Sequence, residues 1–552
     1  MNRFAELLDA LAYEPSRNNK LRMMTDYFRR VEDPERGYAL AAMTGALSFT
    51  HAKPGIIRTL IAERTDPVLF DMSYDYVGDL SETVALMWPA PEGSGTQDRR
   101  NSTPPTLAEV VQTLESASKA DLPRLLVDWL DDLDETGRWA LLKLITGSLR
   151  IGVSARLAKT AVAAMGDFPP NEIEEVWHGL EPPYIDLFAW VEGREPKPDT
   201  RNPAPFRTPM LAHALDEAVD FKALSPGDFV AEWKWDGIRV QAVTGVDAQG
   251  ARVQKLYSRT GEDISDSFPD LVEAFASETF GEIAVDGELL ILREGLVEPF
   301  STLQQRLNRK TVSAKLVAQY PAHIRAYDLL SENGEDLRAL TFAERRLRLE
   351  ALVARLAHSR LDLSTQVGFA DWEALAQARR DPASAGAGGD AEAIEGVMLK
   401  RLDSIYVPGR PKGLWYKWKR DPFNVDAVLM YAQRGHGKRS SFYSDYTFGV
   451  WRGEELVPVG KAYFGFTDQE LIELDRYVRN HTRNRFGPVR ELDFSRDVGL
   501  VLEVAFEGLN RSTRHKSGVA MRFPRVSRIR WDKPAREADD LSALEALLRG
   551  DA

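Results

Sequence analysis

A proline-rich segment, Lys197–Pro209, separates two parts of this sequence that have different hydrophobic patterns. Before it, apolar residues recur at helical spacing, for example in Phe4–Leu11 and Leu122–Leu133. After it, short β-rich runs such as Ala284–Leu292 and Ile324–Leu329 predominate. Because prolines stiffen a chain, the segment predicts a linker between a helical domain and a strand-rich region.

The chain of 552 residues is too long for one hydrophobic core, and such a length suggests about three or four domains. A second boundary is predicted near Asp421–Asn424, after which strand-like runs continue. We therefore expect three domains, at residues 1–200, 206–421 and 422–552. The Ala/Gly-rich run Pro382–Asp390 predicts a mobile surface loop.

The composition excludes several kinds of chemistry. The chain has no cysteine, which excludes disulfides, cysteine-ligated zinc and thiol catalysis and fits a reducing cytoplasm. We expect no signal peptide at Met1–Tyr13 and no membrane association, because no long apolar stretch occurs. The net charge of −13 disfavours nucleic acid as a partner, yet Arg511–Lys533 holds eight Lys/Arg and one acid. Binding depends on where the basic groups cluster, so nucleic acid is not excluded.

One lysine lies in a run with the features of a nucleophilic site, Ala231-Glu232-Trp233-Lys234-Trp235-Asp236-Gly237-Ile238-Arg239. If the run is extended, alternation places Glu232, Lys234 and Asp236 on one face and the two tryptophans on the other. The glycine permits a tight turn, and the arginine can accept phosphate charge. A solvated lysine in a β-turn is the alternative that this run leaves open.

Three clusters downstream supply groups that a phosphoryl-transfer site needs. Asp286 and Glu288 share one face of an apolar strand, where a carboxylate could bind a hard divalent cation; a hairpin turn at Asp-Gly is the alternative. Arg259 lies beside a glycine turn, suited to a ribose or phosphate contact, or is a surface arginine. Tyr327 ends a strand and could stack on a base or pack in the core.

Three later clusters add further charge. Glu395 and Lys400 lie at the two ends of one apolar strand, and five residues apart means opposite faces unless a bulge or twist intervenes. Lys417 and Lys419 share a face and could clamp a triphosphate, or protect a solvated edge strand. The basic run Arg522–Lys533 suits a nonspecific nucleic-acid surface or a mobile phosphate clamp.

The order of these clusters resembles that of the covalent nucleotidyltransferases, which comprise ATP-dependent DNA ligases, RNA ligases and messenger-RNA capping enzymes. The matching motifs are Lys234-x-Asp-Gly-x-Arg239, Ser258-Arg-x-Gly261, Asp286-Gly-Glu288, Tyr327-Asp328, Glu395-Gly-x-Met-x-Lys400 and Lys417-x-Lys419. Further segments resemble ATP-dependent DNA ligases of the bacterial three-domain type. They are Leu149–Ser154, Phe300–Arg306 with Arg309 and Lys310, Gly435–Arg439, and Arg522–Arg525 with Arg530, Asp532 and Lys533.

The resemblance implies a fold of three domains. These are an all-α N-terminal DNA-binding domain, an α+β nucleotidyltransferase (ATP-grasp-like ligase) domain and a C-terminal β-barrel of the OB-fold type. It implies an enzyme that seals nicks in duplex DNA with ATP and Mg²⁺ (Mn²⁺ as a substitute), through a lysyl-AMP and an adenylated 5′-phosphate. We also expect a monomer in the cytoplasm, associated with the nucleoid when on DNA, and a role in DNA repair.

The resemblance also implies roles for individual residues. Lys234 would be the nucleophile, Glu232 would accept from the adenine amine, and Tyr327 would stack on the ring. Glu288 and Glu395 would hold the metal. Contacts to ribose and phosphates would come from Arg239, Arg259, Lys400, Arg410, Lys417 and Lys419, and pyrophosphate would be oriented by Arg530, Asp532 and Lys533. Nucleic-acid contacts would come from Arg150, Gly152, Ser154, Arg306 and Lys310. Trp235 departs from the family pattern, where smaller or phenolic side chains are commoner.

Free lysine has a pKa near 10.4, so only about one molecule in 10³ is neutral at pH 7. We expect cations at Arg239, Lys417 and Mg²⁺ to lower the pKa of Lys234. An RNA ligase or capping-type enzyme shares the catalytic motifs, but the long helical N-terminal part and the motif VI ending disfavour it. The absence of cysteine disfavours an NAD⁺-dependent ligase with its usual zinc module. A catalytically inactive DNA-clamping relative is the alternative from another class.

Overall fold

The computed structural model describes residues 1–549 except 78, 90–103, 148, 201, 308, 310–311, 435–441, 487–488 and 513–514, and for 72, 75–77 and 549 it describes the backbone alone. Lys310 and the run Gly435–Arg439 lie outside the described residues. The chain divides into two compact units. One consists of Met1–Phe168, Glu181–Lys197 and Asp421–Ala552, the other of Pro169–Leu180 and Pro198–Arg420. Among the described residues, no helix has both the length and the apolar composition needed to cross a bilayer.

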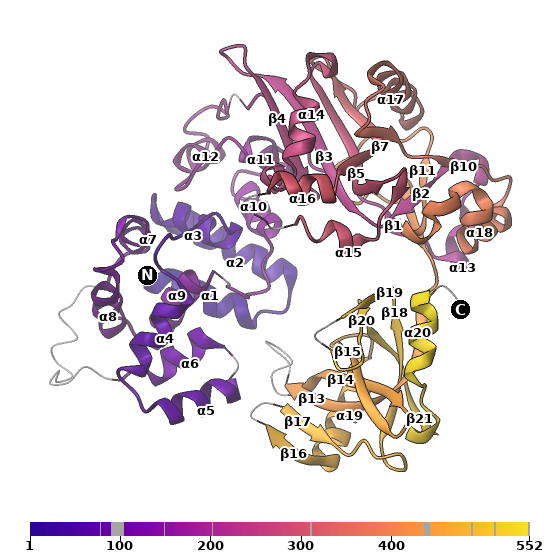
Figure 1. The fold of residues 1–552 in the computed structure, drawn as a ribbon. Coiled ribbons are helices and arrows are strands. Elements are labelled where there is room, and N and C mark those ends of the chain that lie inside the picture. Colours follow the sequence, from indigo (N-terminus) through magenta and orange to yellow (C-terminus); the bar gives the residue numbers. More distant parts are fainter. Residues whose placement is uncertain are drawn as a thin grey trace. The chain divides into compact units, whose positions relative to one another are not determined.

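The N-terminal part consists of helices, without a strand in its described residues before His213 (Figure 1). The predicted helices at Phe4–Leu11 and Leu122–Leu133 are confirmed, and the former buries Phe4, Leu7, Leu8 and Leu11 on one face. The helices are α1 Asn2–Tyr13, α2 Arg17–Arg30, α3 Glu35–Thr44, α4 Pro54–Ala62, α5 Pro67–Val77, α6 Leu80–Met87, α7 Leu107–Ser116, α8 Leu122–Asp132, α9 Glu135–Thr146, α10 Ala155–Ala163, α11 Pro170–Trp177 and α12 Ile185–Val191.

The unit that contains Pro198–Arg420 is built on two sheets. The first has the order β1-β12-β11-β2-β10, and the second has the order β4-β3-β5-β7-β8, with β6 on β5 and β9 on β7. The strands are β1 His213–Ala214, β2 Phe229–Trp235, β3 Ile238–Val246, β4 Arg252–Ser258, β5 Ile283–Arg293, β6 Leu296–Val297, β7 Ala322–Glu332, β8 Glu335–Asp336, β9 Leu361–Leu363, β10 Gln366–Val367, β11 Ile394–Arg401 and β12 Trp415–Lys419. The strands predicted at Ala284–Leu292 and Ile324–Leu329 are thus confirmed as β5 and β7.

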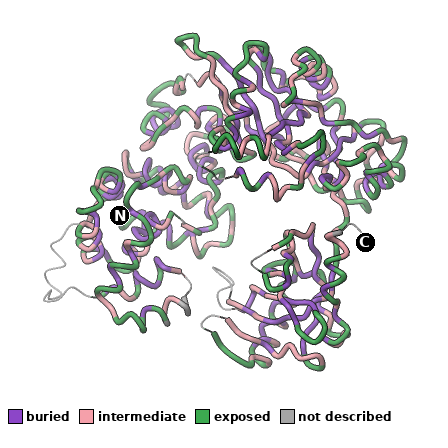
Figure 2. The backbone as a smooth tube through the Cα atoms, viewed as in Figure 1, coloured by how far each residue is buried: buried purple, intermediate pink, exposed green. Residues whose placement is uncertain are grey.

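Helices and apolar clusters cover both sheets of this unit. The helices are α13 Glu217–Ala223, α14 Pro269–Phe275, α15 Phe300–Leu303, α16 Ala314–Gln319, α17 Phe342–Leu356 and α18 Trp372–Arg380. Figure 2 shows the path of the central strands β5 and β7, most of whose residues are buried. The segment predicted as a mobile loop, Pro382–Asp390, instead forms short irregular helical turns. Asp390 anchors it by accepting from the Val297 backbone N–H at 2.9 Å.

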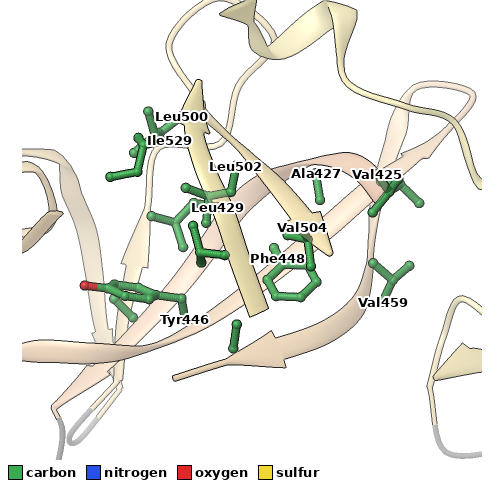
Figure 3. Close-up of a cluster of buried hydrophobic side chains, with 14 of the residues drawn as sticks. Val425, Ala427, Leu429, Tyr446, Phe448, Val459, Leu500, Leu502, Val504 and Ile529 are labelled. Atoms are coloured by element: carbon green, nitrogen blue, oxygen red, sulfur yellow. The ribbon is translucent and has the colours of Figure 1, made fainter. Parts of the chain in front are cut away.

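The C-terminal part is a mostly antiparallel sheet in which the long strand β13 pairs with β14, β17 and β18. Alternate residues of β13, Val425, Ala427 and Leu429, point into one core with Phe448 and Val504 (Figure 3). The elements are β13 Phe423–Arg434, β14 Tyr443–Arg452, β15 Glu455–Ala462, α19 Asp468–His481, β16 Thr482–Phe486, β17 Val489–Leu492, β18 Leu500–Phe506, β19 Gly508–Arg511, β20 Val519–Arg522, β21 Arg525–Pro534 and α20 Leu541–Arg549.

Candidate active site

A pocket of about 410 Å³ opens between the two sheets of the unit that contains Pro198–Arg420, called the central unit below. Strands β2, β11 and β12 line it from one sheet, and β3, β5 and β7 line it from the other. The structure therefore brings together residues that lie far apart in the sequence. Those predicted for the site that line the pocket are Glu232, Lys234, Arg239, Arg259, Glu288, Tyr327, Lys400, Arg410, Lys417 and Lys419.

Lys234 is held in place by the strand on which it lies. Trp233 and Trp235 alternate with it and pack into the apolar cluster beneath β2, as the predicted alternation requires. The turn that follows leaves no room for a side chain at Gly237, where an added Cβ would lie 2.6 Å from the Leu289 carbonyl oxygen. Burial of the tryptophans and this close approach fix the direction in which the lysine points.

A bulge resolves the awkward spacing of Glu395 and Lys400. The ladder between β11 and β2 shifts register between Ile394 and Gly396, and Gly396 has φ 144°. The extra residue at the bulge is Glu395, so regular alternation does not govern the two side chains. Glu395 then contacts the Lys234 ammonium while Lys400 reaches Glu232, and both lie at the same site.

Carboxylates surround the Lys234 ammonium. Burial alone would lower the pKa of Lys234, but the charges of Glu395 and Glu288 outweigh it and raise the pKa above its ordinary value. Our expectation that neighbouring cations lower this pKa is therefore wrong for this arrangement. Burial also raises the pKa of Glu288 to about 7. The charge of Lys234 opposes this rise, whereas the charge of Glu395 adds to it. Because Glu395 holds the ammonium, it is the group placed to accept its proton.

A group of cations gathers around Lys417. Burial lowers the pKa of Lys417, and Lys419 and Arg410 lower it further because like charges lie close by. Lys234 and Arg259 act in the same direction. Cations held this close together favour an anion between them, which is the chemistry of a phosphate site.

Lys400 has a different environment from Lys417 and Lys419. Its Nζ donates to Glu232 Oε2 at 3.0 Å and to the Tyr327 carbonyl oxygen at 3.2 Å, and it lies 4.3 Å from the centroid of the Tyr327 ring. Burial lowers the pKa of Lys400, while Glu232 opposes that change. In the structure the Lys400 ammonium holds Glu232, and the α-phosphate role implied for Lys400 stays a prediction.

Glu232 has a second cationic partner, which the sequence motifs did not reveal. Arg346 on α17 donates to Glu232 Oε1 at 3.1 Å and to the Ser364 carbonyl oxygen at 2.9 Å. The side chains of Glu232 and Lys400 are each 2% exposed. The Glu232 carboxylate thus lies between two cations, each of which donates to one of its oxygens. Arg346 is one of several arginines on α17, and nothing in the sequence distinguishes it from the others.

Arg239 is likewise fixed by residues that its motif does not contain. Its guanidinium donates to Asp286 Oδ2 at 2.6 Å, to the Tyr406 hydroxyl at 3.0 Å and to the Met210 carbonyl oxygen at 2.6 Å. Asp286, which shares the Asp-Gly-Glu motif with Glu288, thus serves to hold Arg239. Arg239 and Glu288 lie at the same site because they are directly opposite each other in the ladder between β3 and β5.

Glu288 and Glu395 fit a hard divalent cation by the chemistry of their oxygen donors. The charge of Glu395 is among the causes that raise the pKa of Glu288, and a cation between them would relieve this repulsion. Within the described residues, no three His, Cys, Asp or Glu side chains gather into a metal-binding group. The two carboxylates of Glu288 and Glu395 suit Mg²⁺, which binds one or two carboxylates together with waters and substrate phosphates.

Arg530 and Lys533 lie on β21 in the C-terminal part, and Asp426 on β13 binds them both. The Asp426 Oδ2 atom accepts from Arg530 Nη1 at 3.1 Å and from Lys533 Nζ at 2.7 Å. Arg530 also pairs with Asp532 at 2.9 Å. These two cations, which the sequence places in one basic run, are therefore gathered around a carboxylate that the motif did not include.

The turn before α10 is tight and contains two residues in the left-handed region. Arg150 and Gly152 have positive φ values of 49° and 65°, and the Ser154 side chain caps α10 by accepting from the Leu157 N–H at 3.2 Å. The predicted cap is thus confirmed. Lys20 on α2 supports the turn from behind, donating to the Ile151 carbonyl oxygen at 2.6 Å and the Gly152 carbonyl oxygen at 3.2 Å.

Arg306 has no surface that nucleic acid could contact, so its predicted role is wrong. Its side chain is 0% exposed and forms a bidentate pair with Asp270, at 2.6 Å and 3.0 Å. It also donates to the carbonyl oxygens of Ser267 and Tyr320. A guanidinium with these partners holds α14 to the segment after α15.

Comparisons with known proteins cover most of the chain. Residues 209–419 match the family model for the ATP dependent DNA ligase domain, 1–163 match DNA ligase N terminus, and 439–533 match ATP dependent DNA ligase C terminal region. A probable DNA ligase of Koribacter versatilis is 31% identical, over 100% of this chain and 96% of the relative. DNA ligase 1 of Korarchaeum cryptofilum is 29% identical, over 99% and 98%. The solved structure Pmar-Lig_PreS3 has a likeness of fold, with TM-score 0.54 and 15% identity over 96% of this chain and 99% of that one. The chain therefore belongs to the ATP-dependent DNA ligase family, with its nucleotidyltransferase domain followed by an OB-like C-terminal domain.

Proposed function

We propose that this ATP-dependent DNA ligase seals nicks in duplex DNA through a covalent AMP on Lys234. The observation that carries the proposal is the surroundings of this lysine. A carboxylate that can take its proton, Glu395, contacts the ammonium, and cations around Lys417 stand beside it in one pocket. Nucleophile, proton acceptor and phosphate clamp are thus combined at a single site.

The proposed reaction has three phosphoryl transfers. In the first, the Lys234 ammonium gives one proton to Glu395, and the neutral Nζ attacks the α-phosphorus of ATP as the bond to pyrophosphate breaks. The nitrogen then releases its second proton to solvent. In the second, an oxygen of the 5′-phosphate attacks the same phosphorus, and AMP leaves the lysine for the DNA. In the third, the 3′-hydroxyl attacks the 5′-phosphate, and AMP departs as the phosphodiester forms.

Each group of side chains in the pocket has a proposed task. Lys417, Lys419, Arg410 and Arg259 bind the phosphates, and Arg239 holds the ribose side of the nucleotide. Tyr327 offers its ring to the base, and the Glu232 carboxylate accepts from the adenine amine. Lys400 holds Glu232 and through it would act on the base, and its contact to the α-phosphate is also proposed.

Glu288 and Glu395 would hold Mg²⁺, or Mn²⁺ in its place. The ion, when bound, neutralises charge on the transferring phosphoryl group. Glu395 pairs with Lys234 in the structure, so Mg²⁺ and the Lys234 ammonium are proposed to compete for this carboxylate. Arg530 and Lys533 would bind the leaving pyrophosphate after exchanging Asp426 for it.

The remaining proposals concern the domains and the setting. The N-terminal domain is proposed as an all-α DNA-binding domain that contacts the DNA backbone at Arg150, Gly152 and the capped helix after Ser154. We propose a monomer in the cytoplasm, associated with the nucleoid on DNA, that serves DNA repair. The family match does not favour an RNA ligase, a capping enzyme or an inactive clamp.

One assay tests the proposed function against its alternatives. The protein is incubated with a nicked duplex and Mg²⁺, in separate reactions with ATP, GTP and NAD⁺, and with a matched substrate whose 5′-phosphate strand is RNA. We expect a sealed DNA strand with ATP alone. Sealing of RNA but not DNA, or sealing with NAD⁺, would contradict the proposal, and binding without sealing would favour the inactive clamp.

Replacing Arg346 by methionine is expected to weaken the distinction between ATP and ITP, which carries oxygen where adenine has its amine. The Glu232 carboxylate, held in place, accepts from an amine and repels a carbonyl oxygen, and Arg346 supplies one of its two cationic partners. Hydrogen bonds to charged groups contribute about 1.5–3 kcal/mol, so about a tenfold loss of discrimination is expected. The measurement is kcat/KM for protein labelling with each nucleotide.

Arg348→Met is the matched control for this experiment. Arg348 lies two residues further on α17 and pairs with Glu332 and Glu335 at the surface. This variant should keep the ATP preference, and Arg346→Lys should restore part of it. An unchanged ATP to ITP ratio in Arg346→Met, with labelling intact, would show that Arg346 is not needed to position Glu232.

A further inference from the structure

Trp235, the residue that follows Lys234, contacts a guanidinium from the other sheet of the central unit. The guanidinium carbon of Arg325 on β7 lies 4.2 Å from the centroid of the Trp235 ring. Both side chains are buried, and cation–π attraction is strongest where water is excluded. The contact therefore joins β7 to the end of β2, one residue beyond the proposed nucleophile (Figure 1).

Two aspartates fix the Arg325 guanidinium in place. Asp362 on β9 accepts from its Nε at 3.0 Å and from its Nη2 at 2.9 Å, which makes a bidentate pair. Arg325 and Asp362 are directly opposite each other in the parallel ladder between β7 and β9, so strand register sets this pair. Asp390 accepts from Nη1 at 3.3 Å. A planar guanidinium with both edges bound keeps one orientation over the Trp235 ring.

Asp390 connects the same guanidinium to the segment that carries Glu395. It lies in the helical turn Gly388–Ala393, which leads directly into β11 and the bulge at Glu395. The turn is also tied to the strand of the nucleophile, because the Asp236 N–H donates to the Ala393 carbonyl oxygen at 2.8 Å. The position of the Glu395 carboxylate thus depends on where this turn lies.

Arg325 therefore contacts the chain on both sides of the ion pair between Lys234 and Glu395. It stacks on the residue after the lysine, and it binds a carboxylate in the turn that precedes the glutamate. Loss of either contact would change the separation of the Lys234 ammonium and the Glu395 carboxylate. Proton transfer between them requires hydrogen-bond distance, so a small change in this separation has a large effect on rate.

We propose that Arg325 is a positioning residue for the first phosphoryl transfer. It holds Lys234 and Glu395 at the separation that proton transfer from the lysine requires. The inference rests on the proposed function, in which Lys234 attacks ATP, and it adds a residue that acts through Trp235 and Asp390 rather than on the nucleotide. The contact uses the tryptophan at which this chain departs from the family pattern.

The test compares Arg325→Met with Arg306→Met in the full chain. The two arginines are matched, because each is buried in the central unit and forms a bidentate pair with an aspartate. Each also lies against an aromatic ring, which is Phe268 for Arg306. Two rates are measured at a temperature at which circular dichroism shows every variant folded. They are labelling by ATP with a radioactive α-phosphate, and sealing of a nick whose 5′-phosphate already carries AMP.

Arg325→Met should lower the maximal rate of labelling by about 10²-fold, because a reacting group displaced by about 1 Å loses that much. The KM for ATP should stay the same, since the side chains that line the pocket are retained. Sealing of the adenylated nick should fall much less, because the third transfer does not pass through Lys234. Arg306→Met should keep the ratio of labelling to sealing. Arg325→Lys retains the charge without the planar fork and should recover part of the labelling.

Asp390→Asn keeps the test decisive if Arg325→Met does not fold. It leaves the pair with Asp362 intact and removes the charge that binds Nη1, so the ratio of labelling to sealing should again fall. The two changes combined should lose less labelling than the product of the separate losses, because both act through one contact.

The outcomes distinguish the positioning role from the proposed function. A ratio of labelling to sealing in Arg325→Met and Asp390→Asn equal to that of the unaltered protein would overturn the positioning role and leave the proposed function standing. Equal losses of both rates would do the same, because they would assign Arg325 to the stability of the fold alone. If the unaltered protein is not labelled by ATP, the proposed function fails and the positioning role fails with it.

Discussion

Lys234→Ala is expected to abolish labelling of the protein by ATP that carries a radioactive α-phosphate. The nucleophilic nitrogen is lost, and a neighbouring lysine cannot replace it because Lys400 is committed to Glu232 and Lys417 lies among the other cations. Removal of a nucleophile that forms a covalent intermediate costs several orders of magnitude in rate, on the order of 10⁴ or more. The measurement is the labelled protein band after incubation with Mg²⁺.

Two controls make this result specific to the covalent step. Lys234→Arg keeps the charge beside Glu395 but cannot form the same bond, and it should be equally unlabelled. Lys234→Ala should still seal a nick whose 5′-phosphate already carries AMP, because the third transfer does not pass through the lysine. Labelling of Lys234→Ala above background would contradict the assignment of the nucleophile.

Arg306→Met is expected to lower the free energy of unfolding of the central unit by about 3–5 kcal/mol. The substitution leaves the Asp270 carboxylate buried without its bidentate partner, and that side chain is 4% exposed. Two backbone carbonyls also lose their donor. For a domain of this size the melting temperature should fall by about 2–4 °C for each kcal/mol. Calorimetry or thermal denaturation followed by circular dichroism gives the measurement.

Arg309→Met is the matched control, three residues along the chain. Arg309 is exposed, and its Nε donates to the Gln305 carbonyl oxygen, so the loss should stay within about 0.5 kcal/mol. The opposite result would restore the nucleic-acid role that the sequence implied for Arg306. In that case Arg306→Met would melt like the unaltered protein and bind nicked DNA less tightly.

Local alternation was sufficient to predict several features of the active site. The side chains of Glu232 and Lys234 face the pocket while Trp233 and Trp235 pack beneath the strand, because successive residues of an extended chain point to opposite faces. The cap at Ser154 and the strands β5 and β7 also followed from patterns within a few residues.

Contacts between distant segments could not be predicted in this way. The sequence separates Arg346 from Glu232 by 114 positions, and their ion pair depends on how α17 packs against β2. In the sequence, Arg306 is a basic residue in a polar segment. Only the structure shows that it is buried and paired with Asp270. The pKa of Lys234 also depends on carboxylates from β5 and β11, which no spacing rule brings near it.

The sequence by itself determined the family, the order of the motifs and the faces of single strands, because these depend on residue identity and on the period of an extended chain. Only the tertiary structure decided which charges meet. A bulge at Glu395 turned that carboxylate onto Lys234, and cross-strand register set Arg239 beside Glu288. Electrostatic partners are chosen by distances of a few ångströms in space, and sheet pairing sets those distances between residues remote in the chain.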